Sequence, residues 1–136
     1  MREKKRMIGV DTSTLIDLFK GSDSLVKLLA TIKEPIFLNR VIYLELLFGL
    51  DPENEKHKKE DEFYYNLFSS FPNLELDFFS SKKTKEIFWG LKKRGKLVGL
   101  FDCVIAGIYL NGGVDKIITK NVGHFENIEG LEVISY

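Results

Sequence analysis

The sequence has little cysteine and no excess of charge of either sign. Cys103 is the only cysteine among 136 residues, so the chain cannot form an internal disulfide or a cysteine-based zinc site. The 20 lysines and arginines balance 20 aspartates and glutamates. This balance excludes a polybasic protein that holds nucleic acid through excess positive charge, although it leaves nucleic acid open as a substrate.

The chain also lacks a long apolar run. After a basic start at positions 2 to 6, the apolar segment 7–10 is interrupted by Asp11, and it is too short for the apolar region of a signal peptide, which needs roughly 7–15 residues. No other run approaches the ~20 residues of a membrane-spanning helix. Together with the single cysteine, this predicts a cytoplasmic protein that does not contact membranes.

Short apolar segments of two kinds alternate along the chain. The pattern predicts strands at 7–10, 36–38, 74–79, 116–119 and 131–134, and helices at 14–20, 24–33, 40–50, 55–71, 81–93 and 100–110. Five strands separated mostly by helices predict one α/β domain over residues 1–136, with a parallel central sheet and helices on both faces. In such a sheet the ligand site lies beyond the carboxyl ends of the strands.

Local signals indicate where some of these helices begin and end. Thr14 and Asp17 have the spacing of a capping box for the first helix, and Gly21 would end it. Asn39 would cap the helix that follows the second strand. Asp17 also lies three residues before Lys20, so we expect these two side chains to pair on the helix surface.

Three acidic residues lie among apolar neighbours, where an ionised carboxylate is costly. Asp11 follows the first strand, Glu45 lies within VIYLELLF, and Asp102 lies within LFDCVIA. Neither Glu45 nor Asp102 has a cation three or four positions away on its own helix. A buried carboxylate without a partner destabilises the fold or becomes protonated.

A shared divalent cation would account for all three acids. Oxygen ligands suit Mg²⁺ or Mn²⁺, and the chemistry that such a site favours is phosphodiester hydrolysis, in which the metal activates a water. The alternative for each single acid is an exposed position or a pairing with a distant arginine.

A basic stretch precedes Asp102 and is opposed only by Glu86. It predicts either an electrostatic track for RNA phosphates or a solvated helix face. Arg94 and Lys96 are the better substrate-binding candidates, because they lie closest in sequence to Asp102. His124 is interpreted as a surface or packing residue, with substrate contact as the alternative. The stretch consists of Lys82, Lys83, Lys85, Lys92, Lys93, Arg94 and Lys96.

Four segments, taken in order, resemble the motifs of the PIN domain family. They are IGVDTSTLIDLF at 8–19, VIYLELLFG at 41–49, RGK at 94–96 with FDCVIA at 101–106, and the closing segment at 117–133. The length and motif order are similar to those of VapC-type ribonuclease toxins. The resemblance implies a PIN-like three-layer sandwich that acts as a metal-dependent endoribonuclease, is paired with a small antitoxin protein, and is often a homodimer.

The resemblance also implies roles for individual residues. Asp11, Glu45 and Asp102 would be metal ligands that position and activate the attacking water. Thr12, which follows the first acid, and Thr119, which would hydrogen-bond within the acidic cluster, would support the site.

Asn121 departs from the pattern, because many members of the family carry a fourth acid at this position. An asparagine carbonyl oxygen can still bind a metal or its water but brings no charge. A second metal would therefore bind more weakly here, while a mechanism with one metal is retained.

Three other interpretations compete with a toxin. The first is a PIN-domain nuclease of RNA processing or decay that has no antitoxin. The second is a non-catalytic interaction module that lost its activity through Asn121, although the three retained acids argue against it. The third is a phosphotransfer fold, either a receiver or a haloacid-dehalogenase-like enzyme. The dehalogenase pattern needs a second aspartate where this chain has Ser13.

Overall fold

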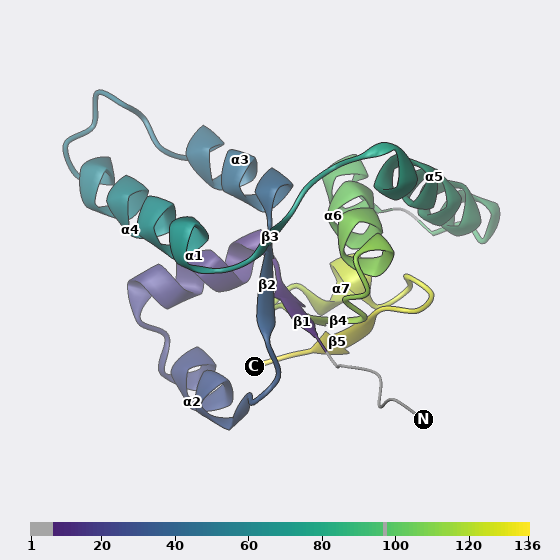
Figure 1. Cartoon of the computed structure of the whole chain (residues 1–136), viewed down its shortest axis with the longest axis horizontal. Helices are drawn as coiled ribbons and strands as arrows, with labels where there is room; N and C mark the ends of the chain where they lie inside the picture. The colour runs from purple at the N-terminus through teal and green to yellow at the C-terminus, as the bar shows by residue number, and fades with distance from the viewer. Residues whose placement is uncertain (1–6, 97) are drawn as a thin grey trace.

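A five-stranded sheet forms the centre of the computed structural model, which describes residues 7–96 and 98–136 (Figure 1). The spatial order is β3-β2-β1-β4-β5, and each neighbouring pair is parallel. Strand order reverses at β1, the place where parallel sheets bind their ligands. The strands are β1 (Ile8–Val10), β2 (Ile36–Asn39), β3 (Asn73–Leu74), β4 (Lys116–Ile118) and β5 (Glu132–Ile134).

Helices cover both faces of this sheet, so the predicted α/β three-layer architecture is confirmed. In Figure 1, α1, α2 and α4 lie to the left of the strands, and α5 lies to the right. No helix within the described residues has the length and apolar character needed to cross a membrane. The helices are α1 (Thr12–Lys20), α2 (Asp23–Thr31), α3 (Arg40–Phe48), α4 (His57–Ser70), α5 (Phe78–Lys93), α6 (Leu100–Asn111) and α7 (Val122–Phe125).

Helices α1 and α5 begin two and three residues earlier than the sequence predicts. The segment 74–79, predicted as a strand, contributes only Leu74 to β3. Asp77 then caps α5: its side chain accepts from the backbone N of Ser80, and Ser80 Oγ accepts from the backbone N of Asp77. The capping box predicted at Thr14 is wrong, because Asp11 caps α1. The short α7 was not predicted, and the basic residues at positions 2 to 6 lie outside the described residues.

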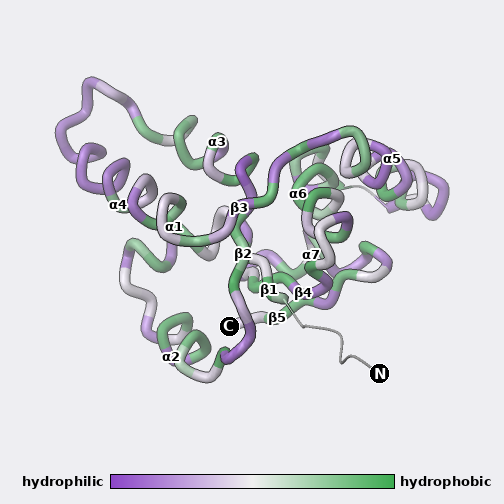
Figure 2. The backbone as a smooth tube through the Cα atoms, viewed as in Figure 1, coloured by the Kyte–Doolittle hydropathy of each residue, from purple (hydrophilic) through white to green (hydrophobic). Residues whose placement is uncertain are grey.

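Helix α6 lies between the sheet and α5 and is largely buried. Figure 2 shows hydrophobic residues gathered in α6, whereas α4 and the connection before it are hydrophilic. The close approach of α5 depends on Gly107, since a Cβ atom there would lie 2.1 Å from Thr84 Oγ1 and 3.0 Å from the Thr84 backbone. The absence of a side chain at this position therefore sets the spacing of the two helices.

Two glycine substitutions should change stability in opposite directions. Gly107→Ala should lower the free energy of unfolding by about 1–3 kcal/mol, because the new methyl group overpacks the α5–α6 contact. Gly90→Ala in α5, where a Cβ would meet nothing within 4 Å, should raise it by about 0.5–1 kcal/mol. Urea unfolding followed by circular dichroism measures both, and equal effects would contradict the close packing.

Candidate acidic site at the strand ends

Asp11 is held in place by four hydrogen bonds at the carboxyl end of β1. Its side chain is only 4% exposed. Oδ1 accepts from Ser13 Oγ at 2.8 Å and from the backbone N and Oγ1 of Thr14 at 3.1 and 2.9 Å. Oδ2 accepts from Thr119 Oγ1 at 2.7 Å, which is the contact expected of Thr119. Donors from two distant parts of the chain therefore fix this carboxylate.

Glu45 reaches the same region from α3. Thr12 Oγ1 donates to Glu45 Oε1 at 2.9 Å, so the structure brings these two candidate site residues together. Burial raises the pKa of Glu45 above its ordinary value; the Thr12 hydrogen bond opposes the shift, and the carboxylates of Asp102 and Asp11 add to it. No lysine or arginine of the described residues forms an ion pair with Glu45.

Asp102 lies in the first turn of α6 and has a partner that the sequence analysis missed. His124 Nδ1, in α7, lies 3.1 Å from Asp102 Oδ2. Burial raises the pKa of Asp102, His124 lowers it, and the carboxylate of Asp11 raises it further. The sequence held one signal for this contact, since His124 follows Thr119 closely, just beyond the end of β4.

A buried asparagine connects the elements that carry Glu45 and Asp102. Asn39 ends β2 and caps α3 by accepting from the backbone N of Val41 at 3.1 Å, as predicted. Its Nδ2 donates to the carbonyl oxygen of Ile105, in α6, at 3.1 Å. One side chain therefore ties α3 to α6, and Asn39 is fully buried.

The three acids share one electrostatic environment without forming a closed ligand cluster. Asp11 and Asp102 raise the pKa of Glu45, and Asp11 raises that of Asp102. Nevertheless, no group of three or more His, Cys, Asp or Glu in the described part of the chain is arranged to hold a metal ion.

The structure gives the remaining site candidates different surroundings. The backbone N of Asn121 donates to Thr119 Oγ1 at 2.9 Å, which places this residue beside the Asp11 network. The Arg94 guanidinium donates to the carbonyl oxygen of Asn127 at 2.7 Å, and this contact involves none of the three acids. Lys96 is exposed and lines a pocket beside Cys103, the neighbour of Asp102. RNA contact by Arg94 and Lys96 and metal binding by Asn121 stay predictions.

Asp17 finds partners other than the one expected. Instead of pairing with Lys20, it accepts from the Tyr136 hydroxyl at 2.5 Å and lies 3.3 Å from Lys120 Nζ.

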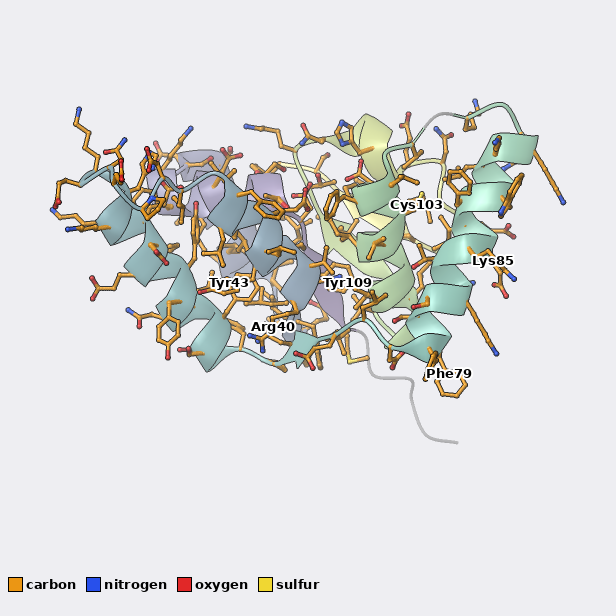
Figure 3. All side chains as sticks on the ribbon, turned by 90° about the horizontal axis from the view of Figure 1, so that it is seen from above. Arg40, Tyr43, Phe79, Lys85, Cys103 and Tyr109 are labelled. Atoms are coloured by element: carbon orange, nitrogen blue, oxygen red, sulfur yellow. The ribbon has the colours of Figure 1, made fainter. Side chains whose placement is uncertain are left out.

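Figure 3 shows Lys85 pointing from α5 away from α6. That part of the basic stretch therefore faces away from the helix that carries Asp102.

Comparison with known proteins places this geometry in a family. Residues 8–131 match the PIN domain model, and the chain belongs to the PIN domain family. It is 31% identical over 100 residues to Ribonuclease VapC3 of Methanocaldococcus jannaschii, covering 74% of this chain and 95% of that protein. It is 26% identical over 132 residues to Ribonuclease VapC1 of Rickettsia felis, covering 93% of each.

Solved structures show the same fold. VapBC-5 of Mycobacterium tuberculosis, a member of the VapBC family of toxin–antitoxin systems, matches with a TM-score of 0.75 and 17% identity. The match covers 96% of this chain and 98% of that chain.

The repulsion between the acidic side chains predicts that Glu45→Gln stabilises the metal-free fold. Because the pKa of Glu45 is raised above its ordinary value of 4.5, the ionised carboxylate destabilises the folded state as pH rises through that range. Gln keeps the acceptor for Thr12 and removes the charge. In EDTA at pH 7.5 the variant should gain about 0.5–2 kcal/mol in urea unfolding.

The gain should disappear near pH 3.5, where Glu45 is protonated in both states. The exposed Glu62→Gln in α4 is the matched control and should change little. A loss of stability in Glu45→Gln at pH 7.5 would contradict the electrostatic coupling.

Proposed function

We propose that this chain is a Mg²⁺- or Mn²⁺-dependent endoribonuclease that hydrolyses RNA phosphodiester bonds with water, and that it is the toxin of a toxin–antitoxin pair. Two relatives that align over most of their length are named ribonucleases. The observation that carries the proposal is the convergence of Asp11, which follows β1, with Glu45 of α3 and Asp102 of α6 into one mutually repelling group at the switch point of the sheet.

The donor chemistry of this site fits a hard divalent cation. The ligands on offer are carboxylate oxygens, joined by the amide oxygen of Asn121, and such oxygens suit Mg²⁺ and Mn²⁺. Two of the carboxylates have a raised pKa, and a cation would relieve the repulsion that contributes to it. Mg²⁺ needs only one or two protein carboxylates because it keeps several waters, so a closed cluster is not required.

The chain's own residues would orient the reacting groups. Thr119 and Thr14 fix the Asp11 carboxylate, and Thr12 holds Glu45 in place. A bound divalent cation would supply a water of lowered pKa and would offset the charge on the phosphate oxygens. The carboxylates of Glu45 and Asp102, both partly open to solvent, would then orient that water and accept its proton.

The related toxin–antitoxin complexes support the proposal that this chain binds an antitoxin. The VapBC-5 structure belongs to a toxin–antitoxin system, which supports a small antitoxin protein as the partner of this chain. A homodimer and a cytoplasmic location belong to the same proposal. A PIN-domain nuclease of RNA processing or decay, without an antitoxin, is the alternative that the experiments below separate from it.

RNA cleavage tests the enzymatic half of the proposal. Purified wild type should cleave RNA with Mg²⁺ or Mn²⁺ and stop in EDTA, whereas Asp11→Asn and Glu45→Gln should lose about a hundredfold or more of the rate, because each removes a ligand charge. The Glu62→Gln control should cleave like wild type. Activity that survives EDTA, or equal rates in all variants, would overturn the proposed mechanism.

Growth assays test the toxin half of the proposal. Induced expression of the wild-type chain should arrest a bacterial host, and Asp11→Asn should not, since arrest would require cleavage of cellular RNA. A small protein that co-purifies with this chain from its natural host should restore growth when the two are expressed together. Harmless wild-type expression combined with RNA cleavage in vitro would favour the RNA-processing alternative.

A further inference from the structure

Tyr109, in α6, brings its hydroxyl to the last residue of β1. The side chain is fully buried, and Figure 3 shows it in the middle of the molecule, between the α3 and α6 sides. Its hydroxyl donates to the carbonyl oxygen of Val10 at 2.6 Å and accepts from the backbone N of Val10 at 3.1 Å. A single phenol therefore satisfies both backbone groups of the residue that precedes Asp11.

The hydroxyl lies between β1 and β2 at this point of the sheet, where the carbonyl oxygen of Phe37, in β2, is a second acceptor at 3.4 Å. β1 pairs with β4 over all three of its residues but with β2 only at Ile8 and Gly9. Backbone groups of successive strand residues face opposite neighbours. Ile8 N bonds on the β2 side and Asp11 N on the β4 side, so the groups of Val10 face β2. The Tyr109 hydroxyl thus bonds the backbone groups of Val10 at the point where the direct pairing of β1 with β2 stops.

Gly9 makes room for this ring. A Cβ atom at Gly9 would lie 2.6 Å from Cζ of Tyr109 and 2.7 and 2.8 Å from its two Cε atoms. Glycine in a strand marks a close approach of this kind. The small residue in β1 and the large residue in α6 therefore form one unit, and neither can change alone without disturbing the strand end.

The same helix carries Asp102. Tyr109 follows Asp102 by seven positions, which is about two helical turns, so both residues lie along one face of α6. Val10 is bonded covalently to Asp11. The phenol hydroxyl therefore links the helix that carries one acid to the strand end that carries another. Burial also raises the pKa of Tyr109, so the hydroxyl keeps its proton and can donate.

We infer that Tyr109 is a positioning residue, which together with Gly9 fixes the placement of Asp11 relative to Asp102. The inference rests on the proposed nuclease function for its effect on catalysis. Its structural content, that the hydroxyl holds the end of β1, stands on the hydrogen bonds alone.

Tyr109→Phe tests the inference, with Tyr64→Phe as the matched control. Tyr64 is also fully buried and donates to Glu60 at 2.7 Å, but it lies in α4, outside the acidic site. In Tyr109→Phe the Val10 amide should exchange with solvent about tenfold faster or more, relative to the Glu132 amide of β5. In Tyr64→Phe that ratio should match the wild type.

Kinetics separate positioning from general destabilisation. Tyr109→Phe should lower kcat for RNA cleavage by roughly ten- to a hundredfold with KM within about twofold of wild type, because misplacement of a reacting group acts on the chemical step. Tyr64→Phe should keep wild-type kcat even if it lowers the unfolding midpoint. Equal kcat in wild type and Tyr109→Phe, or an equal fall in both variants, would overturn the inference.

A double variant tests whether Gly9 and Tyr109 act as one unit. Gly9→Ala alone should lower kcat as Tyr109→Phe does, because the methyl group displaces the ring. Gly9→Ala/Tyr109→Phe should lose less than the product of the two single losses. Multiplicative losses would show two independent sites.

A wild-type chain that cleaves no RNA would overturn the proposed function instead. The Val10 exchange ratio then decides the inference: a ratio raised only in Tyr109→Phe sustains it, and an unchanged ratio refutes it.

Discussion

The buried carboxylate of Asp11 is the interaction on which the rest of the site depends. A carboxylate that is almost completely buried needs hydrogen-bond donors. The fold supplies hydroxyl and backbone amide groups from residues near both ends of the chain. Those donors fix the turn from β1 into α1 and bring β4 against it through Thr119. Glu45 and Asp102 both lie near enough to this carboxylate for its charge to raise their pKa.

The order of the strands explains why the other acids arrive there. β1 lies at the centre of the sheet, with β2 on one side and β4 on the other. Helix α3 leaves the end of β2 through Asn39 and delivers Glu45, and the segment after β4 delivers His124 to Asp102. Residues far apart in sequence meet because parallel strands end at one edge.

The sequence pattern was sufficient wherever a signal was local or periodic. The strand before Asp11, the Asn39 cap and the end of α1 at Gly21 all lie where the pattern places them. Local signals gave the wrong start for α1, at Thr14, and a strand in place of the start of α5, at residues 77–79. In both cases an aspartate caps the helix. Asp11 lies three residues before Thr14, and Asp77 lies four residues before the predicted start at 81, and each satisfies the free backbone N–H groups of its helix.

Contacts between distant segments were beyond the sequence pattern for a physical reason. Asp17 has a cation three residues away on its own helix, yet the folded chain brings to it Lys120 and Tyr136, which lie 103 and 119 residues further along the sequence. No pattern within one helix can show such contacts. The phenol of Tyr109 beside Gly9 gives no periodic signal, because a single glycine in a strand does not say which ring will fill its space.

Asp11 directly follows a strand, caps a helix and lies at the centre of the site. Its Oδ1 satisfies the first turn of α1, while its negative charge belongs to the acidic group. Most replacements at this position would therefore remove a helix cap and a charge together, so folding and chemistry constrain the same side chain. Asparagine separates the two constraints, because its amide oxygen can still cap the helix although it is neutral.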